Sequence, residues 1–318
     1  MQRPSALIVA CLAATWLIWG STYLAIRFAF PGFPPFFQMG SRFVVAGSLL
    51  LGWVWLRGRR LPSAREWRNA TLIGTLMLLG GMGGVAYAEQ TVASGLVVVF
   101  IAICPVFVAL ANLPFGVRPQ PLELAGIAIG MVGVALLASG AGFSASPAGL
   151  AAVCAATLCW SLGSVLSLHR LPLAPGPVGF ASEMLCGGMV LLIVSRLAGE
   201  HFHWPPPPLA AAAWAYLVVF GSLIAFTAYM TLLSRTRAAL ATSYSFVNPL
   251  IALLLGIGLG GEAVSQREWL AAGIVVVGVI TLMLGRQAPG AAAEPAGQPP
   301  GRGRAALPPG APTGPNAS

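Results

Sequence analysis

The 318-residue sequence contains no lysine and no aspartate, and only 8 % of its residues are charged. Without lysine, the chain cannot form the phosphate-binding loop of a P-loop ATPase. Without aspartate, it has neither an aspartyl-phosphate intermediate nor an acidic EF-hand loop. A soluble domain carries about 25 % charged residues, so this chain has too few to cover a water-facing surface. The composition therefore excludes a soluble globular protein and argues against ATP hydrolysis as an energy source.

Long apolar runs take the place of the missing charge. Hydrophobic residues make up 57 % of the chain, and a helix needs about 20 of them in succession to cross a membrane. We predict an all-α integral membrane protein with ten transmembrane helices. The predicted spans are 6–28, 35–56, 69–88, 92–115, 122–141, 148–168, 177–197, 209–233, 238–259 and 268–285.

Arginines are concentrated in alternate connections between these spans. If the N-terminus is inside, thirteen of the seventeen arginines lie in inner segments, and Arg196 and Arg267 are the two in outer loops. Cytoplasmic loops of membrane proteins carry such an excess of arginine and lysine. We therefore predict that both termini face the cytoplasm. The net charge of +9 then reflects topology, and we expect no nucleic-acid partner.

Cysteines and histidines do not form a recognisable metal site. The five cysteines all fall inside predicted spans without paired spacing, which is typical of small apolar residues. His201 and His203 lie near Glu200 in one outer loop, where two histidines without further ligands favour a hydrated loop. We expect no metal and no cofactor. Residues 286–318 are rich in alanine, proline and glycine, and we predict a disordered cytoplasmic tail.

The sequence also contains an internal duplication. A nearly constant offset in the numbering places Trp19 on Trp160 and aligns the segments that follow in the same order. Because each copy holds five helices, the second copy enters the membrane from the opposite face. Such inverted repeats are typical of secondary transporters, whose substrate site lies between the halves. We predict two five-helix repeats, residues 1–141 and 142–285.

Four segments carry a family resemblance. They are "WLIWGSTYLAIRFAF", "SRFVVAG", "AYAEQTVASGLVVVFIAICPVFVAL" and "SYSFVNPLIALLLGIGLGGE". Together they resemble the EamA-type branch of the drug/metabolite transporter superfamily, over residues 6–285. The resemblance implies ten helices in two inverted halves and export of small metabolites, often amino acids or related compounds. In one departure, Val117 stands where the second half has Glu262.

Polar and aromatic residues inside the spans are the candidate substrate-binding residues. Ionisable groups in a membrane need a partner or a cavity, so we predict that Arg42 attracts a substrate carboxylate. Its repeat mate Glu183 is the candidate for proton exchange, and structural packing is the alternative for both residues. Glu89 could bind an amine or simply hydrate a loop. The full set is Trp19, Ser21, Tyr23, Arg42, Tyr87, Glu89, Trp160, Ser164, Tyr229, Tyr244, Ser245 and Asn248.

Two prolines interrupt predicted spans near mid-membrane. Pro105 and Pro249 are predicted to kink their helices and free backbone carbonyls for polar groups. The residues around Pro249 are polar, whereas those around Pro105 are apolar. We expect the ninth span to supply hydrogen bonds to a cavity and the fourth to supply an apolar wall. Hydrogen bonding between helices is the alternative.

These features predict a secondary exporter of small organic metabolites in the cytoplasmic membrane of a bacterium, working by alternating access. Amino acids or related compounds are the expected substrates, and proton antiport is a hypothesis. We predict that the protein is not an enzyme. An uncoupled facilitator of the same fold is one alternative; a membrane-embedded enzyme or a sensor belongs to another class and stays open.

Overall fold

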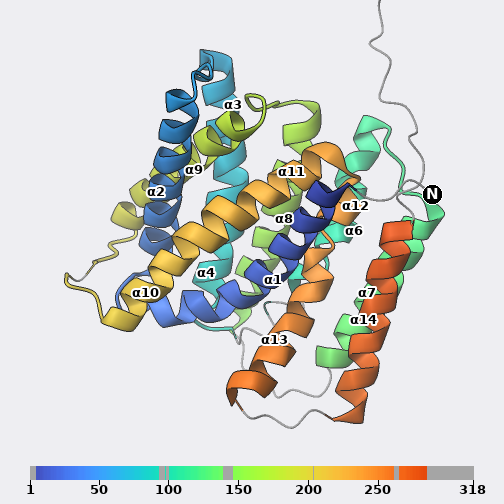
Figure 1. Ribbon diagram of the computed structural model, residues 1–318. Coiled ribbons are helices and arrows are strands. Elements are labelled where there is room, and N and C mark those ends of the chain that lie inside the picture. Colours follow the sequence, from blue (N-terminus) through green and yellow to red (C-terminus); the bar gives the residue numbers. More distant parts are fainter. Residues whose placement is uncertain are drawn as a thin grey trace, which may run out of the picture. The chain divides into compact units, whose positions relative to one another are not determined.

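The computed structural model describes residues 5–92, 97, 100–138, 146–202, 204–260 and 265–284. Every element assigned in this part of the chain is a helix (Figure 1). The tail predicted to be disordered, residues 286–318, lies outside the described residues.

In the first half, the helices match the predicted spans 6–28 and 35–56 closely, whereas the helix predicted at 69–88 begins at Ala64 and a turn at residues 102 and 103 interrupts the predicted span 92–115. In chain order they are α1 (Ala6–Ala29), α2 (Pro35–Leu56), α3 (Ala64–Gly74), η1 (Thr75–Gly83), α4 (Gly84–Ala88), α6 (Cys104–Asn112), η2 (Leu113–Phe115) and α7 (Pro121–Ala138). The π-helical segment η1 joins α3 to α4 without a break, so Ala64–Ala88 is one long helix.

The second half is built in the same way. Its helices are α8 (Pro147–His169), α9 (Pro177–Leu197), α10 (Pro208–Tyr216), η3 (Leu217–Phe226), α11 (Thr227–Arg235), α12 (Ala238–Ala241), α13 (Tyr244–Gly260) and α14 (Gln266–Leu284). Again a π-helical segment, η3, lies inside one long helix, Pro208–Arg235.

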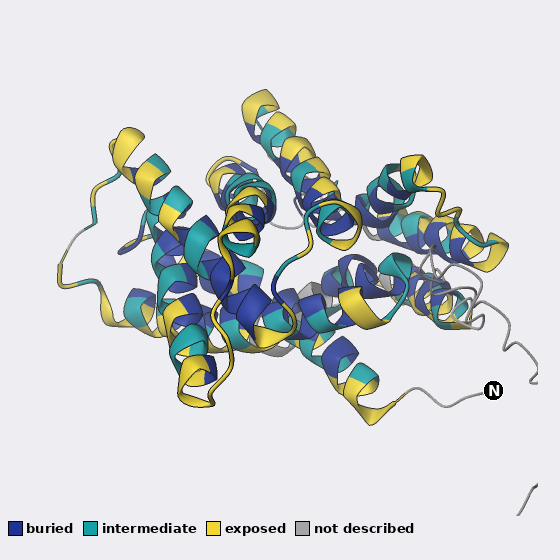
Figure 2. Cartoon of the chain, turned by 90° about the horizontal axis from the view of Figure 1, so that it is seen from above, coloured by how far each residue is buried: buried dark blue, intermediate teal, exposed yellow. Residues whose placement is uncertain are grey.

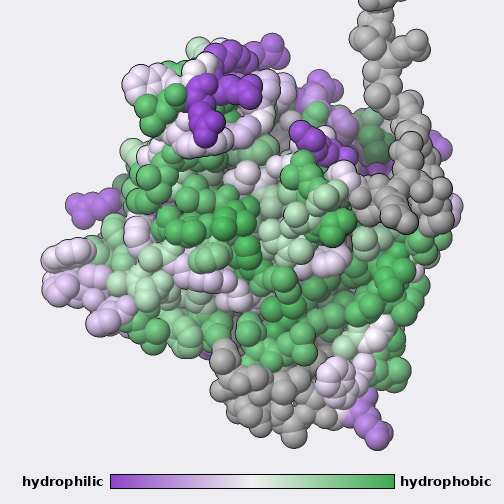
Figure 3. Space-filling model, viewed as in Figure 1, coloured by the Kyte–Doolittle hydropathy of each residue, from purple (hydrophilic) through white to green (hydrophobic). Residues whose placement is uncertain are grey.

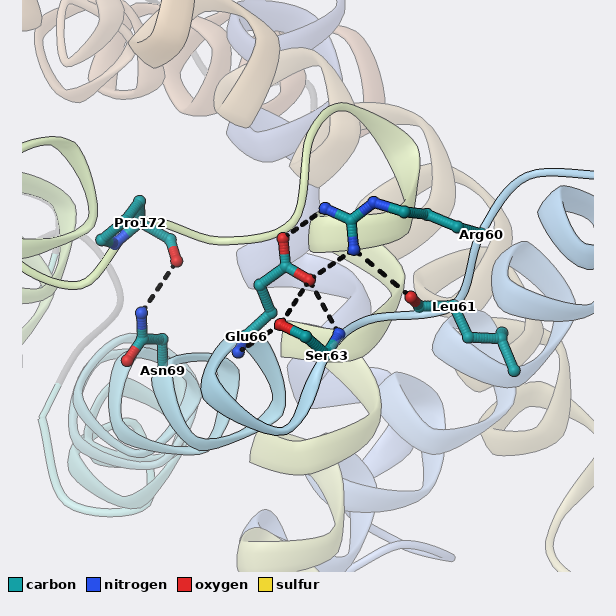
Figure 4. A network of polar contacts seen from close by, with 6 residues as sticks. All are labelled: Arg60, Leu61, Ser63, Glu66, Asn69 and Pro172. Atoms are coloured by element: carbon teal, nitrogen blue, oxygen red, sulfur yellow. Dashed lines mark hydrogen bonds and ion pairs between the residues drawn. The ribbon is translucent and has the colours of Figure 1, made fainter.

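Local sequence signals explain where α3 begins. Ser63 and Glu66 form a capping box, in which the Ser63 side chain accepts from the Glu66 N–H and the Glu66 carboxylate accepts from the Ser63 N–H (Figure 4). Arg60 donates to the same carboxylate at 2.6 and 2.7 Å, and this hydrogen bonding raises the pKa of Arg60.

A second bond ties α3 to the other half of the chain, since the Asn69 amide donates to the Pro172 carbonyl at 2.9 Å. That bond connects the start of α3 to the loop between α8 and α9.

Six of the helices are long and apolar enough to cross a membrane. They are Ala6–Ala29, Pro35–Leu56, Ala64–Ala88, Pro147–His169, Pro177–Leu197 and Pro208–Arg235, and shorter apolar helices follow at Cys104–Phe115, Pro121–Leu136 and Trp269–Leu284. Hydrophobic residues cover most of the surface in Figure 3, and hydrophilic ones gather at its upper edge, near the ends of α2 and α3. Buried residues face neighbouring helices, whereas exposed residues lie on the outward sides (Figure 2). The predicted all-α membrane architecture is confirmed at this level.

Glycines allow two pairs of helices to pack closely. The α2–α9 and α7–α14 pairs have the most extensive contacts (Figure 1). A Cβ atom at Gly47 would lie only 2.7 Å from the backbone nitrogen of Leu185, and one at Gly188 would lie 2.8 Å from that of Val44. Gly188 is the repeat mate of Gly47, and Leu185 is the repeat mate of Val44 at the same offset. The contact between the two helices is therefore reciprocal.

The α7–α14 pair repeats this arrangement. A Cβ atom at Gly133 would lie 2.8 Å from the nitrogen of Val275, and one at Gly278 would lie 2.6 Å from the nitrogen of Gly130. One constant offset in the numbering again relates Gly133 to Gly278 and Gly130 to Val275. Each helix of the pair therefore offers the same face to the other.

Candidate functional site

One cavity opens between helices of both halves of the chain. Its empty volume, which includes the solvent-open part, is about 560 Å³. Five of the predicted site residues line it: Trp19, Tyr23, Arg42, Trp160 and Tyr244. The remaining lining residues are Thr22, Ile26, Gly81, Met82, Val85, Ile101, Cys104, Ala156 and Thr157.

Helical periodicity explains how α1 supplies its wall. Trp19, Thr22 and Ile26 are spaced three and four residues apart, so they share one face of α1. All three are buried and line the cavity. On α8, Thr157 and Trp160 are spaced three residues apart and also line it. Both helices thus direct a mixed polar and aromatic face toward the same space.

Aromatic rings close one end of the cavity. The Trp19 ring lies 4.6 Å from Tyr244, 5.3 Å from Tyr229 and 5.6 Å from Trp160, between ring centroids. The Trp19 Nε1–H donates to the Gly221 carbonyl at 3.2 Å, which fixes the orientation of the indole. This cluster brings four rings from α1, α8, α11 and α13 together.

Ser164 and Tyr229 extend the cluster away from the cavity. Their hydroxyl oxygens are 2.7 Å apart, and the Ser164 hydroxyl also donates to the Trp160 carbonyl at 2.8 Å. Both side chains are fully buried, and neither lines the cavity. Their bond therefore connects α8 to α11 behind the aromatic end.

Arg42 is the charged residue in the described cavity wall. Its side chain is only 1 % exposed, and its Nε and Nη1 atoms have no hydrogen-bond partner. The guanidinium carbon lies 4.5 Å from the centroid of the Phe43 ring. Moving a charged group from water into a protein interior costs on the order of several kcal/mol when no partner compensates for the lost hydration. An arginine kept in this state is suited to bind a carboxylate that enters the cavity.

Two glutamates are also buried without a hydrogen-bond partner among the described residues. Glu183 on α9 is fully buried and Glu89 at the end of α4 is 3 % exposed, and both oxygens of each carboxyl lack a hydrogen-bond partner. Neither residue lines the cavity. Glu183 therefore does not lie beside Arg42 at the cavity wall, although the two are repeat mates.

The polar segment of α13 contacts α1. The Asn248 amide donates to the Tyr23 hydroxyl at 3.3 Å, and the Asn248 Oδ1 atom is buried without a partner. Ser245 donates to the Thr242 carbonyl within its own chain segment. Pro249 lies inside α13. Of this segment, Tyr244 reaches the cavity.

Other predicted residues lie away from the cavity. Tyr87 is 45 % exposed and stacks against Phe36 with ring centroids 6.1 Å apart. The Ser21 hydroxyl is 2.6 Å from the Tyr216 hydroxyl on α10. Pro105 lies in the first turn of α6, directly after a turn in the chain.

Our sequence prediction missed several wall residues. Thr22 and Thr157 place hydroxyl-bearing side chains in the cavity wall. The signal for both was available in the sequence, because each lies three residues from a predicted tryptophan, on the same helical face. Met82 and Val85 carry no such signal, since apolar residues occur throughout the spans.

Comparison with known proteins identifies the class. The model of the "EamA-like transporter family" matches the chain twice, at residues 5–139 and 147–284. The protein is thus a multi-pass transporter of the inner membrane. It belongs to the EamA-like transporter family, within the drug/metabolite transporter superfamily.

A curated relative agrees with this assignment, and a solved structure shares the fold. The chain is 44 % identical over 280 residues to "Uncharacterized inner membrane transporter YedA" of Escherichia coli K12, covering 88 % of this chain and 91 % of the relative. It is 25 % identical to "Protein PagO" of Salmonella typhimurium, covering 91 % and 96 %. A solved structure entitled "Crystal structure of protein" shares the fold, with a TM-score of 0.72 at 23 % identity, covering 89 % of this chain and 98 % of that one.

Proposed function

We propose that this transporter exports small organic metabolites that carry a carboxylate, amino acids or related compounds, by alternating access of two inverted five-helix repeats. The observation that carries the proposal is Arg42, a buried guanidinium with two unpartnered nitrogen atoms in a cavity between helices of both halves. The aromatic and apolar wall around it suits the organic part of such a substrate.

Matching features in both halves support the repeat. The π-helical segments Thr75–Gly83 and Leu217–Phe226 begin at equivalent places in two long helices. The reciprocal glycine contacts of α2 with α9 and of α7 with α14 are those expected for a two-fold relation between the halves. The family model also matches each half separately.

Contacts between connections support ten spans with both termini inside. Asn69 with Pro172, and Glu123 with Arg237, join segments that we assign to the cytoplasmic side. On the other side, Glu200 accepts hydrogen bonds from the backbone at the start of α2. Each of these bonds joins a helix, near one of its ends, to a connection that the proposed topology assigns to the same face.

The position of the cavity favours an outward-facing arrangement. Tyr23 and Arg42 lie in the outer halves of α1 and α2 under the proposed orientation, and both line the cavity. Ser164, the repeat mate of Tyr23 in the inner half of α8, is instead buried and bonded to Tyr229. At this pair of equivalent positions the inner side is therefore packed where the outer side is hollow, and the second cavity between the halves lies elsewhere.

Glu183 is the residue that we assign to proton exchange. It is fully buried without a hydrogen-bond partner, and intramembrane carboxyl groups serve as proton carriers in many transporters. If the two repeats exchanged their conformations, Glu183 would face an inner cavity in the way that Arg42 now faces the outer one. There the carboxyl could release its proton to the cytoplasm before the substrate is carried outward.

The experiment compares the metabolites that cells release into the medium when they overproduce the wild type, Arg42→Gln or Glu183→Gln. A fourth strain that overproduces Arg59→Gln controls for the loss of a surface charge. We expect the wild type and Arg59→Gln to enrich the medium in one group of carboxylates, and Arg42→Gln to abolish that enrichment. An unchanged profile for Arg42→Gln would contradict the proposed site.

Proton coupling needs a separate measurement. Purified protein in proteoliposomes should transport the identified carboxylate faster under an imposed pH gradient, and Glu183→Gln should remove that response. Transport by the wild type that ignores the gradient would instead indicate an uncoupled facilitator.

A further inference from the structure

A second cavity lies away from the proposed substrate site, where α6, α7, α8 and α12 meet. Its empty volume is about 700 Å³. Its wall includes the apolar residues Val108, Ile127 and Leu168 and the basic residues Arg118 and Arg237. Since α6 and α7 belong to the first half of the chain and α8 and α12 to the second, the cavity is shared between the halves.

The charges in this wall are unevenly paired. Arg237 donates through Nε and Nη2 to Glu123, with Nη2 and Oε2 at 2.9 Å, and the backbone N–H of Gln120 donates to the same oxygen at 2.9 Å. These bonds occupy the Glu123 carboxylate. Arg118 is exposed, and the described residues give it no carboxylate partner. The cavity therefore keeps a net positive charge and a free guanidinium.

Polar contacts hold another side of the wall in place. The Asn112 amide donates to the Val108 carbonyl at 2.9 Å, so its oxygen faces His169 Nε2, at 3.0 Å. His169 Nε2 must then carry a hydrogen. The imidazole also stacks on Phe115, with centroids 4.4 Å apart. These contacts fix the orientation of the imidazole in the cavity wall.

We propose that this cavity binds an anionic phospholipid, with its phosphate ester at Arg118 and Arg237 and an acyl chain along the apolar wall. Arginine binds phosphate oxygens in a bidentate manner, and basic pockets between transmembrane helices on the cytoplasmic side bind anionic headgroups. An apolar wall beside a free guanidinium suits an amphiphile better than free phosphate. The inference rests on the proposed orientation, and it goes beyond the proposed transport because the ligand is not the cargo.

The test measures lipid binding and not transport. Purified full-length protein in a neutral detergent is titrated with phosphatidylglycerol, phosphatidylcholine or glycerol 3-phosphate, and bound molecules are counted by native mass spectrometry. We expect the wild type to prefer phosphatidylglycerol. Arg118→Gln should weaken that binding by about fivefold, the factor expected for one arginine near an anionic surface. Arg59→Gln, an exposed arginine outside this cavity, is the matched control and should bind as the wild type does.

Three outcomes would overturn the proposal. Equal loss in Arg118→Gln and Arg59→Gln would indicate general surface attraction. Equal binding of phosphatidylglycerol and phosphatidylcholine would show that the net charge of the lipid headgroup is not recognised. Binding of glycerol 3-phosphate as tight as that of phosphatidylglycerol would identify a site for free phosphate esters. Because no arm depends on transport, failure here would leave the substrate cavity unaffected.

Discussion

Trp19 and Trp160 meet edge to face, with ring centroids 5.6 Å apart and an interplanar angle of 79°. They are also repeat mates, at equivalent positions in the two halves of the sequence. Two equivalent residues touch each other only close to the axis that relates their repeats. This contact therefore places the proposed two-fold axis beside the cavity that both tryptophans line.

The reciprocal glycines make the first prediction. Gly47→Ala and Gly188→Ala should each destabilise the protein by about 1–3 kcal/mol, the usual cost of overpacking, because backbone atoms less than 3 Å away cannot yield. Gly52→Ala on α2 is the control, since a Cβ atom there meets nothing within 4 Å. Thermal unfolding in detergent provides the measurement, and equal midpoints for all three variants would contradict the close approach of α2 and α9.

Helix positions were largely predictable from the sequence. Apolar length and proline positions predicted the observed bounds of α2 and α9, Pro35–Leu56 and Pro177–Leu197. Both begin with a proline, which suits the first turn of a helix. The π-helical segments Thr75–Gly83 and Leu217–Phe226 could not be predicted, because an extra residue per turn leaves no mark in an apolar run.

The candidate site was predictable only in part. Trp19, Tyr23 and Arg42 reach the cavity as polar or aromatic residues inside spans are expected to do. Tyr87 and Tyr229 are repeat mates with the same sequence signal, yet Tyr87 is 45 % exposed and Tyr229 is fully buried. A sequence pattern cannot distinguish them, since the exposure of each tyrosine depends on which helices pack against it.

The ion pair of Glu123 with Arg237 makes the second prediction. Its side chains are 5 % and 29 % exposed, so a double-mutant cycle of Glu123→Gln and Arg237→Gln should give a coupling energy of about 1–3 kcal/mol. Arg60 with Glu66 is the comparison pair. Because Arg60 is 59 % exposed, we expect a smaller coupling there that salt weakens further.

Unfolding in detergent at low and high salt measures both cycles. Additive effects of Glu123→Gln and Arg237→Gln would show that this ion pair does not hold α7 to the α11–α12 connection. Equal salt sensitivity of the two cycles would likewise contradict the burial of Glu123.

Glu200 makes the third prediction. Its carboxylate accepts from the backbone N–H groups of Phe36 and Phe37 at 3.0 and 2.8 Å, which caps the start of α2 from another loop. Glu200→Ala should cost about 1 kcal/mol, the usual value of a helix cap. His201→Ala, next in the chain, is the control because it makes no such bond to α2 in the described residues. If both variants lower the unfolding midpoint equally, the cap is not the cause.

Arg42 makes the last prediction, which combines protein and substrate variants. If its guanidinium binds the substrate carboxylate, the wild type should discriminate between an amino acid and the corresponding amide, which lacks the negative charge. Losing a hydrogen bond to a charged group costs about 1.5–3 kcal/mol, so we expect KM for the acid to rise about 10- to 100-fold in Arg42→Gln. KM for the amide should change little. Arg42→Lys keeps the positive charge but lacks the planar guanidinium. Its KM for the acid should therefore lie between the values of the wild type and Arg42→Gln. Transport in proteoliposomes measures all six combinations, and a parallel loss for acid and amide would show that Arg42 supports the helix packing and does not bind the carboxylate.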